Sequence, residues 1–331
     1  MSMVKNILLA TGLSLFSAAA IPAQAASPTI EVEAGMFGGT LYNLSYALSE
    51  VFKTQHPDIK LVPVETTGNA AGIIKASASP ADRLVAGSAI PLQEAIQGVS
   101  PFPKKFEKFR FVAGACVHAE TLITLDPNIR TLADLSGKRI GLGPQPSMQG
   151  RTMWSIMRDS IPGSDDMKPF WMNWSSLKDS IIDGSLDCMV LGVGIIPDDH
   201  WQPVSVYAEI VASRGNPHLI SFTPEKLAEA AKRDGFIYPP LEIPANAIAE
   251  GVPAEPVLAW SEQLGFYAFE ELPDEVAYAV FKTLYENGEE LRKYTPDARG
   301  TAPETVMPPK ELPDSLIHPG TLRYLKEKGL R

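Results

Sequence analysis

Cysteine is scarce in this chain, whose 331 residues include two, Cys116 and Cys188. Each lies in an apolar run with the character of a β-strand, residues 111–116 and residues 186–191. In an oxidising compartment the two thiols could pair, because structural disulfides persist there. We interpret them instead as separate buried thiols that behave as small hydrophobic side chains.

Positive charge is also in short supply. The chain has 29 Lys and Arg against 39 Asp and Glu, which gives a net charge of −10. This balance argues against binding of nucleic acid or of anionic lipid. It does not exclude a small anionic ligand, because charges more than roughly 8–10 Å away are screened and local main-chain amides decide such a site.

Common catalytic and nucleotide-binding motifs are missing. No GxxxxGK[ST] phosphate loop and no GxSxG elbow occur, and Gly141 and Gly143 lack the third glycine of a dinucleotide-binding fingerprint. Residues 175–178 match S-x-x-K, but no K-T-G follows, and the five histidines show no metal-ligand spacing. We therefore predict a protein that is not an enzyme, without catalytic residues, cofactor or metal. An exported hydrolase that uses Ser147 or Ser175 is the alternative.

Long apolar runs are limited to residues 7–20, which are too few to span a membrane. Lys5 precedes this run, and the small residues Ala23 and Ala25 follow it, a pattern typical of a signal peptide cleaved near Ala25. No Leu-x-x-Cys lipoprotein site is present. Residues 1–25 are therefore expected to be removed on export to the periplasm, leaving about 300 residues, enough for two lobes. Loss of Lys5 would change the net charge to 28 − 39 = −11.

The chain does contain a strand, a glycine turn and a helix in the same order twice. Residues 30–34 predict a strand, 35–40 a turn and 40–52 a helix, and residues 138–142, 143–150 and 152–159 repeat the pattern. A second strand at 58–64 is followed by another turn, 66–69. Helices entered through glycines leave main-chain N–H groups and the positive end of the helix dipole free for an anion. We predict an α/β protein whose ligand lies between two lobes.

Further patterns complete this prediction. Residues 109–125 are a long apolar stretch that could hold two strands, and residues 257–268 predict a strand that crosses back. We place lobe 1 at residues 26–125 plus 256–331 and lobe 2 at residues 126–255. Gly192 and Gly194 follow a predicted strand at 186–191. Phe37, Met148 and Trp171 are either core residues or an apolar wall against the ligand.

Several motifs, in this order, resemble those of the TAXI solute receptors of TRAP transporters. They lie at residues 37–42, 66–68, 132–140, 177–187, 192–197, 243–247 and 318–329. The resemblance implies a two-lobed type II periplasmic binding fold, with two doubly wound sheets joined by crossing strands. It also implies capture of a small organic carboxylate for an ion-gradient-driven permease, and we expect a monomer. A ligand-sensing subunit for a membrane kinase is a second hypothesis that the sequence does not separate from transport.

The resemblance also suggests site residues. Gly39, Thr40 and Tyr42 would face the ligand from lobe 1, and main-chain amides near Ser147 and Gln149 would hold a carboxylate from lobe 2. Here Pro-Ser-Met-Gln replaces the family's Gly-Ser-Gly-Thr, which removes one N–H donor and adds apolar bulk. We therefore expect a carboxylate that is larger or less polar than glutamate. The full set of predicted ligand-binding residues is Phe37, Gly38, Gly39, Thr40, Tyr42, Thr67, Gly68, Asn69, Ser88, Ser147, Met148, Gln149, Gly150, Trp171, Gly192 and Gly194.

Overall fold

The computed structural model describes residues 28–331 except 36, 38, 144, 146, 147, 159, 160, 162, 197–199, 204 and 311. The predicted signal peptide and two predicted site residues, Gly38 and Ser147, lie outside the described residues. Within the described residues, no helix is both long and apolar enough to cross a membrane.

The first third of the chain alternates strands and helices. Its elements are β1 (Thr29–Glu33), α1 (Thr40–Gln55), β2 (Lys60–Val64), α2 (Asn69–Ala76), β3 (Arg83–Ser88) and α3 (Ala89–Gln97). The strands pair in parallel in the order β2-β1-β3. Helix α1 lays Leu44, Leu48 and Phe52 against this sheet, because residues three to four apart share one face of a helix. The predicted strand and helix within residues 30–52 are confirmed.

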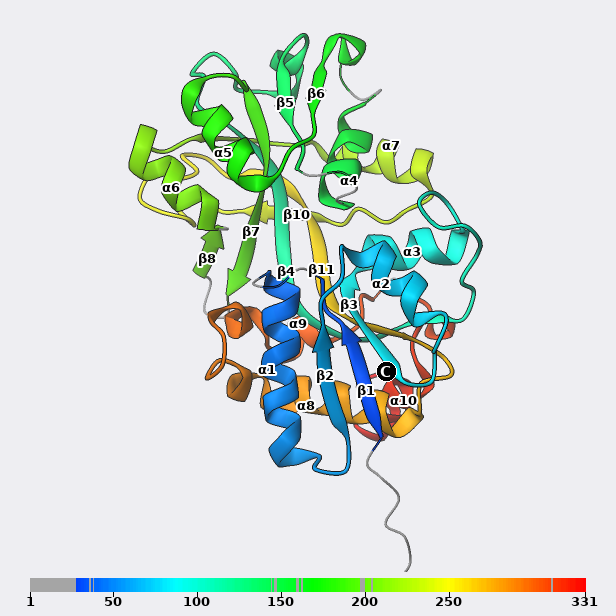
Figure 1. Cartoon of the computed structure of the whole chain (residues 1–331). Helices are drawn as coiled ribbons and strands as arrows, with labels where there is room; N and C mark the ends of the chain where they lie inside the picture. Colours follow the sequence, from blue (N-terminus) through cyan, green and yellow to red (C-terminus); the bar gives the residue numbers. More distant parts are fainter. Residues whose placement is uncertain are drawn as a thin grey trace, which may run out of the picture.

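Two long strands connect the halves of the molecule. Strand β4 (Phe109–Thr124) and strand β11 (Val257–Phe269) pair antiparallel from Trp260↔Glu120 to Phe269↔Phe109. Residues 109–124 thus form one continuous strand rather than two, because β11 pairs with the main chain of β4 along most of the length of β4. The sheet runs β2-β1-β3-β11-β4-β7-β5-β6, so the two predicted sheets are continuous through β11 and β4 (Figure 1).

The middle of the chain builds the other half. Its elements are η1 (Leu132–Leu135), β5 (Arg139–Gly141), α4 (Met148–Met157), η2 (Ser164–Asp166), β6 (Lys168–Phe170), α5 (Trp174–Asp183), β7 (Cys188–Ile196), β8 (His200–Pro203), α6 (Ser205–Arg214), β9 (His218–Ile220), α7 (Pro224–Asp234) and β10 (Pro240–Ile243). Strand β7 extends beyond the predicted end at 191, because β4 pairs with it through Glu120↔Gly192 and His118↔Gly194. Gly192 and Gly194 therefore lie inside a strand and not in the turn that follows one. Helix α4 begins at Met148, four residues before the predicted start.

The chain then returns to the first half. Helices α8 (Asp274–Leu291), α9 (Pro303–Val306) and α10 (Pro319–Glu327), with η3 (Pro296–Gly300) and η4 (Asp314–Leu316), follow β11. Helix α8 buries Val276, Val280 and Leu284 in the same core as α1. Two further clusters of buried residues fill the other half, and both are built largely from residues between 119 and 260. Cys116 and Cys188 are free and buried, as predicted.

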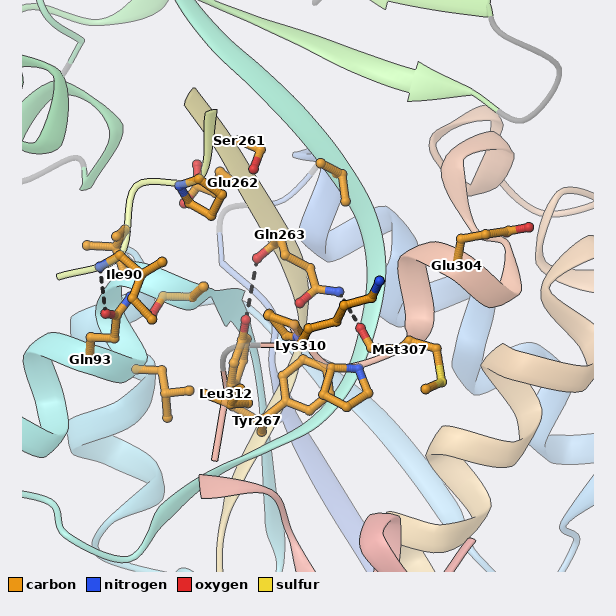
Figure 2. A pocket seen from close by; sticks show the side chains of 18 of the residues that line it. Ile90, Gln93, Ser261, Glu262, Gln263, Tyr267, Glu304, Met307, Lys310 and Leu312 are labelled. Carbon is orange, nitrogen blue, oxygen red and sulfur yellow. Dashed lines mark hydrogen bonds between the residues drawn. The ribbon is translucent and has the colours of Figure 1, made fainter. Parts of the chain in front are cut away.

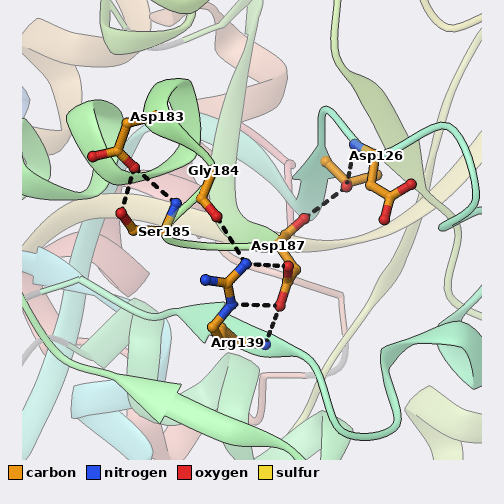
Figure 3. Close-up of polar contacts among 7 residues, drawn as sticks. Asp126, Arg139, Asp183, Gly184, Ser185 and Asp187 are labelled. Carbon is orange, nitrogen blue, oxygen red and sulfur yellow. Dashed lines mark hydrogen bonds and ion pairs between the residues drawn. The ribbon is translucent and has the colours of Figure 1, made fainter.

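A charged clamp fixes the start of β7 beside β5 (Figure 3). The carboxylate of Asp187 accepts hydrogen bonds from Arg139 Nε at 2.9 Å, Arg139 Nη2 at 2.6 Å and the Arg139 main-chain N–H at 2.7 Å. Asp183, at the end of α5, accepts from the main-chain N–H of Ser185 at 2.7 Å. The clamp holds the residue before β7 against the first residue of β5, where these two parallel strands pair.

Candidate functional site

A cleft lies where the two halves meet. It consists of two adjoining cavities of about 740 and 320 Å³. Both cavities are lined by Gly39, Thr40, His118, Gln149, Trp174 and Gly192. These residues come from α1, β4, α4, α5 and β7, so residues far apart in sequence converge on one space.

Helix N-termini form the wall contributed by the first half. Gly39 caps α1 and Gly68 caps α2, and neither helix has a side-chain cap. The first main-chain bond of α1 runs from the Asn43 N–H to the Gly39 carbonyl at 2.9 Å. The N–H groups of Thr40 and Tyr42 precede that bond and have no partner within the helix. Gly68 has φ of 141°, which glycine alone tolerates easily, so the turn needs this residue.

The opposite wall carries an amide and an indole. Gln149 lies in the first turn of α4, and Trp174 is the first residue of α5. The Asn173 side chain caps α5 by accepting from the Ser176 N–H at 2.9 Å, so this N–H group already has a partner within the protein. Trp174 therefore offers an apolar surface with a polar edge to the cleft.

The floor of the cleft is acidic. Side chains alternate along a strand, so His118 and Glu120 of β4 face the same side, and Glu262 of β11 pairs opposite His118. Glu120 is 2% exposed and Glu262 is 4% exposed. Burial raises the pKa of both carboxyls, that of Glu262 to about 7, while a hydrogen bond from Ser88 acts against the shift in Glu262. Burial also lowers the pKa of His118 to about 4, so the imidazole is neutral at pH 7.

One charged residue of each sign lies at the rim. The Asp297 carboxylate accepts from Asn43 Nδ2 at 2.7 Å, which ties η3 to α1. Arg299 is exposed two residues later. Among the described lining residues, Arg299 is the one cationic side chain.

The structure brings half of the predicted site residues to the cleft. Those that line it are Gly39, Thr40, Tyr42, Gly68, Asn69, Gln149, Gly192 and Gly194. The described residues that do not line it are Phe37, Thr67, Ser88, Met148, Gly150 and Trp171.

Packing explains most of the residues that lie off the cleft. A Cβ on Gly150 would stand 1.8 Å from the Leu142 carbonyl oxygen and 2.9 Å from a ring carbon of Trp171. Gly150 therefore allows α4 to approach the strand end, and Trp171 packs beside it. Phe37 is 76% exposed, and its ring makes an edge-to-face contact with the ring of Tyr42, with the ring centroids 5.1 Å apart. Ser88 is buried and accepts from Asn69 Nδ2 at 3.4 Å, so it supports a residue of the cleft.

Sequence reasoning missed the floor. His118, Glu120 and Glu262 sit in stretches predicted as strands, where a polar residue every second position is usually a solvated face. Cys116, His118 and Glu120 stand at every second position of one predicted strand, and this alternation is the signal in the sequence that could have identified the floor. Trp174, which lines both cavities, was also absent from the predicted site residues.

A separate cavity of about 720 Å³, outside the cleft, lies beside β11 (Figure 2). Its lining is mostly apolar and includes Ile90, Tyr267, Met307 and Leu312. Gln263 is held in place by its own amide, which donates to the Met307 carbonyl at 2.8 Å. Because the helix N-termini of α1 and α2 do not reach it, we assign the candidate site to the cleft.

Solved structures show which fold this is. A structure described as a periplasmic transporter covers 84% of this chain and 89% of its own, with 13% identity and a TM-score of 0.50. A TctC solute-binding protein from Polaromonas covers 82% and 86% (14% identity, TM-score 0.47). MatC from Rhodopseudomonas palustris, solved with bound malate, covers 91% and 95% (12% identity, TM-score 0.48). The fold is that of type II periplasmic binding proteins, as predicted.

The sequence itself places the chain in a family. Residues 32–329 match the NMT1-like family, and the chain belongs to it. No curated protein matches the chain significantly. Other solved structures with a similar fold are described as the periplasmic aliphatic sulphonate-binding protein SsuA from Escherichia coli and the periplasmic binding protein BugD.

Proposed function

We propose that this protein is an exported solute-binding protein that captures a small organic carboxylate in the cleft and delivers it to a TRAP-type permease. The observation that carries the proposal is the convergence of the α1, α2 and α4 N-termini on one cavity system. Main-chain N–H groups and helix dipoles at such ends favour a negatively charged group. The resemblance to TAXI receptors and the periplasmic neighbours support the same class of function and an extracytoplasmic location.

Ligand capture would follow from the two-lobe arrangement. We take the lobes as residues 26–125 plus 256–331 and residues 126–255, with β4 and β11 crossing between them. A ligand that contacts Thr40 on one side and Gln149 on the other binds best when the lobes are closed. Its differential affinity then shifts the population toward the closed state, which the permease recognises. The proposal requires no chemical step and no partner other than ligand and permease.

Purification from the periplasm provides the first test. Gentle unfolding of the purified protein should release a small carboxylate in an amount nearly equimolar with the protein, and mass spectrometry should identify it. A thermal-shift screen of organic acids should identify the same chemical class. A specific ligand at one hundred times its Kd stabilises by roughly 2.7 kcal/mol. Failure of every carboxylate to shift the melting curve, or turnover of an ester or amide by the purified protein, would reject the proposal.

A further inference from the structure

We propose that Glu120 and Glu262 form a subsite for a protonated amine, so that the ligand carries an ammonium group in addition to its carboxylate. The inference rests on the proposed function, because it describes the other end of the ligand held in the same cleft.

The two carboxylates are placed together by strand pairing. Glu120 lies opposite Trp260, and Glu262 is two residues further along β11, opposite His118. Diagonal neighbours of this kind are roughly 7–8 Å apart in an antiparallel pair, within reach of long side chains on one face. The two acids therefore point into the cleft from adjacent strands, close enough for one small cation to contact both.

The surroundings of Glu120 are built to hold a carboxylate. Gln149 Nε2 donates a hydrogen bond to its Oε2 from the opposite wall. On β7, a Cβ at position 192 would stand 3.0 Å from Glu120 Oε1, so the glycine leaves room for that oxygen. His118 Nδ1 is 3.8 Å from the same oxygen, which is too far for a hydrogen bond. One oxygen of Glu120 is thus positioned by Gln149, and the other faces the cleft.

Glu262 has an acceptor left over. Glu262 is 4% exposed, and Ser88 supplies one hydrogen bond to its carboxyl group. Its Oε1 atom has no hydrogen-bond partner. A buried carboxylate oxygen without a donor destabilises the ligand-free protein. The atom itself is buried in the ligand-free protein, and Glu262 lines the cavity, so a ligand group that enters there can supply the missing donor.

No protein cation supplies that partner. Of the described groups facing the pair, Ser88, Asn69, Gln149 and Thr40 are uncharged, and His118 is neutral at pH 7. The remaining charged groups nearby are Asp297 and Arg299 at the rim, and Glu94 with Arg151. Glu304, Lys310 and Arg331 line the cavity beside β11, which Glu262 also lines, and Arg331 pairs with Asp314 at 2.6 Å. Arg151 already donates to both oxygens of Glu94, at 2.7 and 2.9 Å.

An ammonium group fits these requirements. It has three donors, a positive charge and a small size, and a hydrogen bond to a charged partner is about twice as strong as a neutral one. In the empty cleft, mutual repulsion and burial keep a proton on the pair. Entry of the cation ionises both carboxyls, and the proton is released to solvent.

Matched pairs of acids test the subsite. The probes are L-glutamate with glutarate, β-alanine with propanoate, and L-phenylalanine with hydrocinnamate, measured by calorimetry at pH 7 on the full mature chain. We expect the amine-bearing member of the best-binding pair to bind at least about tenfold more tightly. In phosphate and Tris buffers, whose ionisation enthalpies differ, its binding should release about one proton. Equal or tighter binding of the amine-free member overturns the inference.

Substitutions of matched shape locate the effect. Glu262→Gln and Glu120→Gln keep the size of the side chain, and each should abolish the difference in affinity between the amine-bearing and the amine-free acid. Glu242→Gln, on the exposed face of β10, is the control and should leave that difference unchanged. Retention of the full amine preference in both folded variants overturns the inference, as does calcium binding that competes with the amine.

Failure of this inference can be distinguished from failure of the proposed function. Tight binding of glutarate or hydrocinnamate with no gain from an amine rejects the subsite alone. Absence of binding by all six acids, together with no carboxylate among the co-purified molecules, rejects the proposed function and the subsite with it.

Discussion

Asp187 and Glu120 are carboxylates that flank the same strand, β7, in opposite environments. Asp187 lies just before β7, beside Arg139 of β5, whose hydrogen bonds hold the pKa of this carboxyl below its usual value. Glu120 lies in the cleft, where burial raises its pKa and none of the described lysine or arginine side chains pairs with it. The first acid is satisfied within the fold and stabilises it. The second is left for a partner that arrives from outside.

Removal of Asp187 should have the largest effect on folding. Asp187→Ala deletes three charge-assisted hydrogen bonds to Arg139, and we expect a loss of about 2 kcal/mol in the free energy of unfolding. Ligand affinity should stay unchanged. Urea unfolding and calorimetry measure the two quantities. Glu209→Ala is the control, since Glu209 pairs with Lys178 at the surface and should contribute less than about 0.5 kcal/mol. A loss of affinity with normal stability would contradict the contrast between Asp187 and Glu120.

Glu262, the other acid of the cleft floor, and Asp187 should give the free energy of unfolding opposite dependences on pH. The folded pKa of Glu262, about 7, exceeds its ordinary 4.5, so its contribution is full below pH 4.5 and is lost as pH rises through 7. Asp187 has a lowered pKa, and its contribution is lost only as pH falls below 3.8. The ligand-free protein should lose about 2 kcal/mol between pH 5 and 8. Glu262→Gln should flatten this decline, and an unchanged slope in the variant would contradict the assignment.

The same contrast explains what the sequence could predict. Residues 183–187 belong to a motif that the sequence analysis identified, and in the structure they form the clamp with Arg139 where β5 and β7 pair. Helix periodicity and glycine turns predicted α1, and the site wall at Gly39 and Thr40 follows from them, because uncapped helix ends are visible in local sequence.

The floor could not be predicted in this way. Glu120 and Glu262 are 142 positions apart, and only the pairing of β4 with β11 makes them neighbours. The register that places Gly192 beside Glu120 is likewise a property of the assembled sheet. Local patterns also gave Gly150 a place in the site, whereas the close approach of α4 to Leu142 accounts for that glycine.

Gly192 offers a smaller perturbation of the floor. In Gly192→Ala the new Cβ would lie 3.0 Å from Glu120 Oε1, so the carboxylate must shift by a few tenths of an ångström. We expect ligand affinity to fall by roughly fivefold, about 1 kcal/mol. Gly194→Ala is the control, because its nearest contact would be 3.4 Å from the Gln202 carbonyl, an ordinary separation. Equal affinities of the two variants, measured by calorimetry, would show that the space beside Glu120 is not needed.

The wall at α1 should give the smallest effects. Tyr42→Ala and Thr40→Ala remove side chains at the cleft but leave the main-chain N–H groups in place, so we expect each to weaken binding only about two- to fivefold. Tyr46→Ala is the matched control, because Tyr46 lies one turn further along α1 and is 46% exposed. Calorimetry with the best carboxylate of the screen gives the affinities. Because the amides carry the attraction, losses should be the same for amine-bearing and amine-free acids. A loss confined to the amine-bearing acid would instead place the ammonium group at α1 and leave Glu120 without its expected partner.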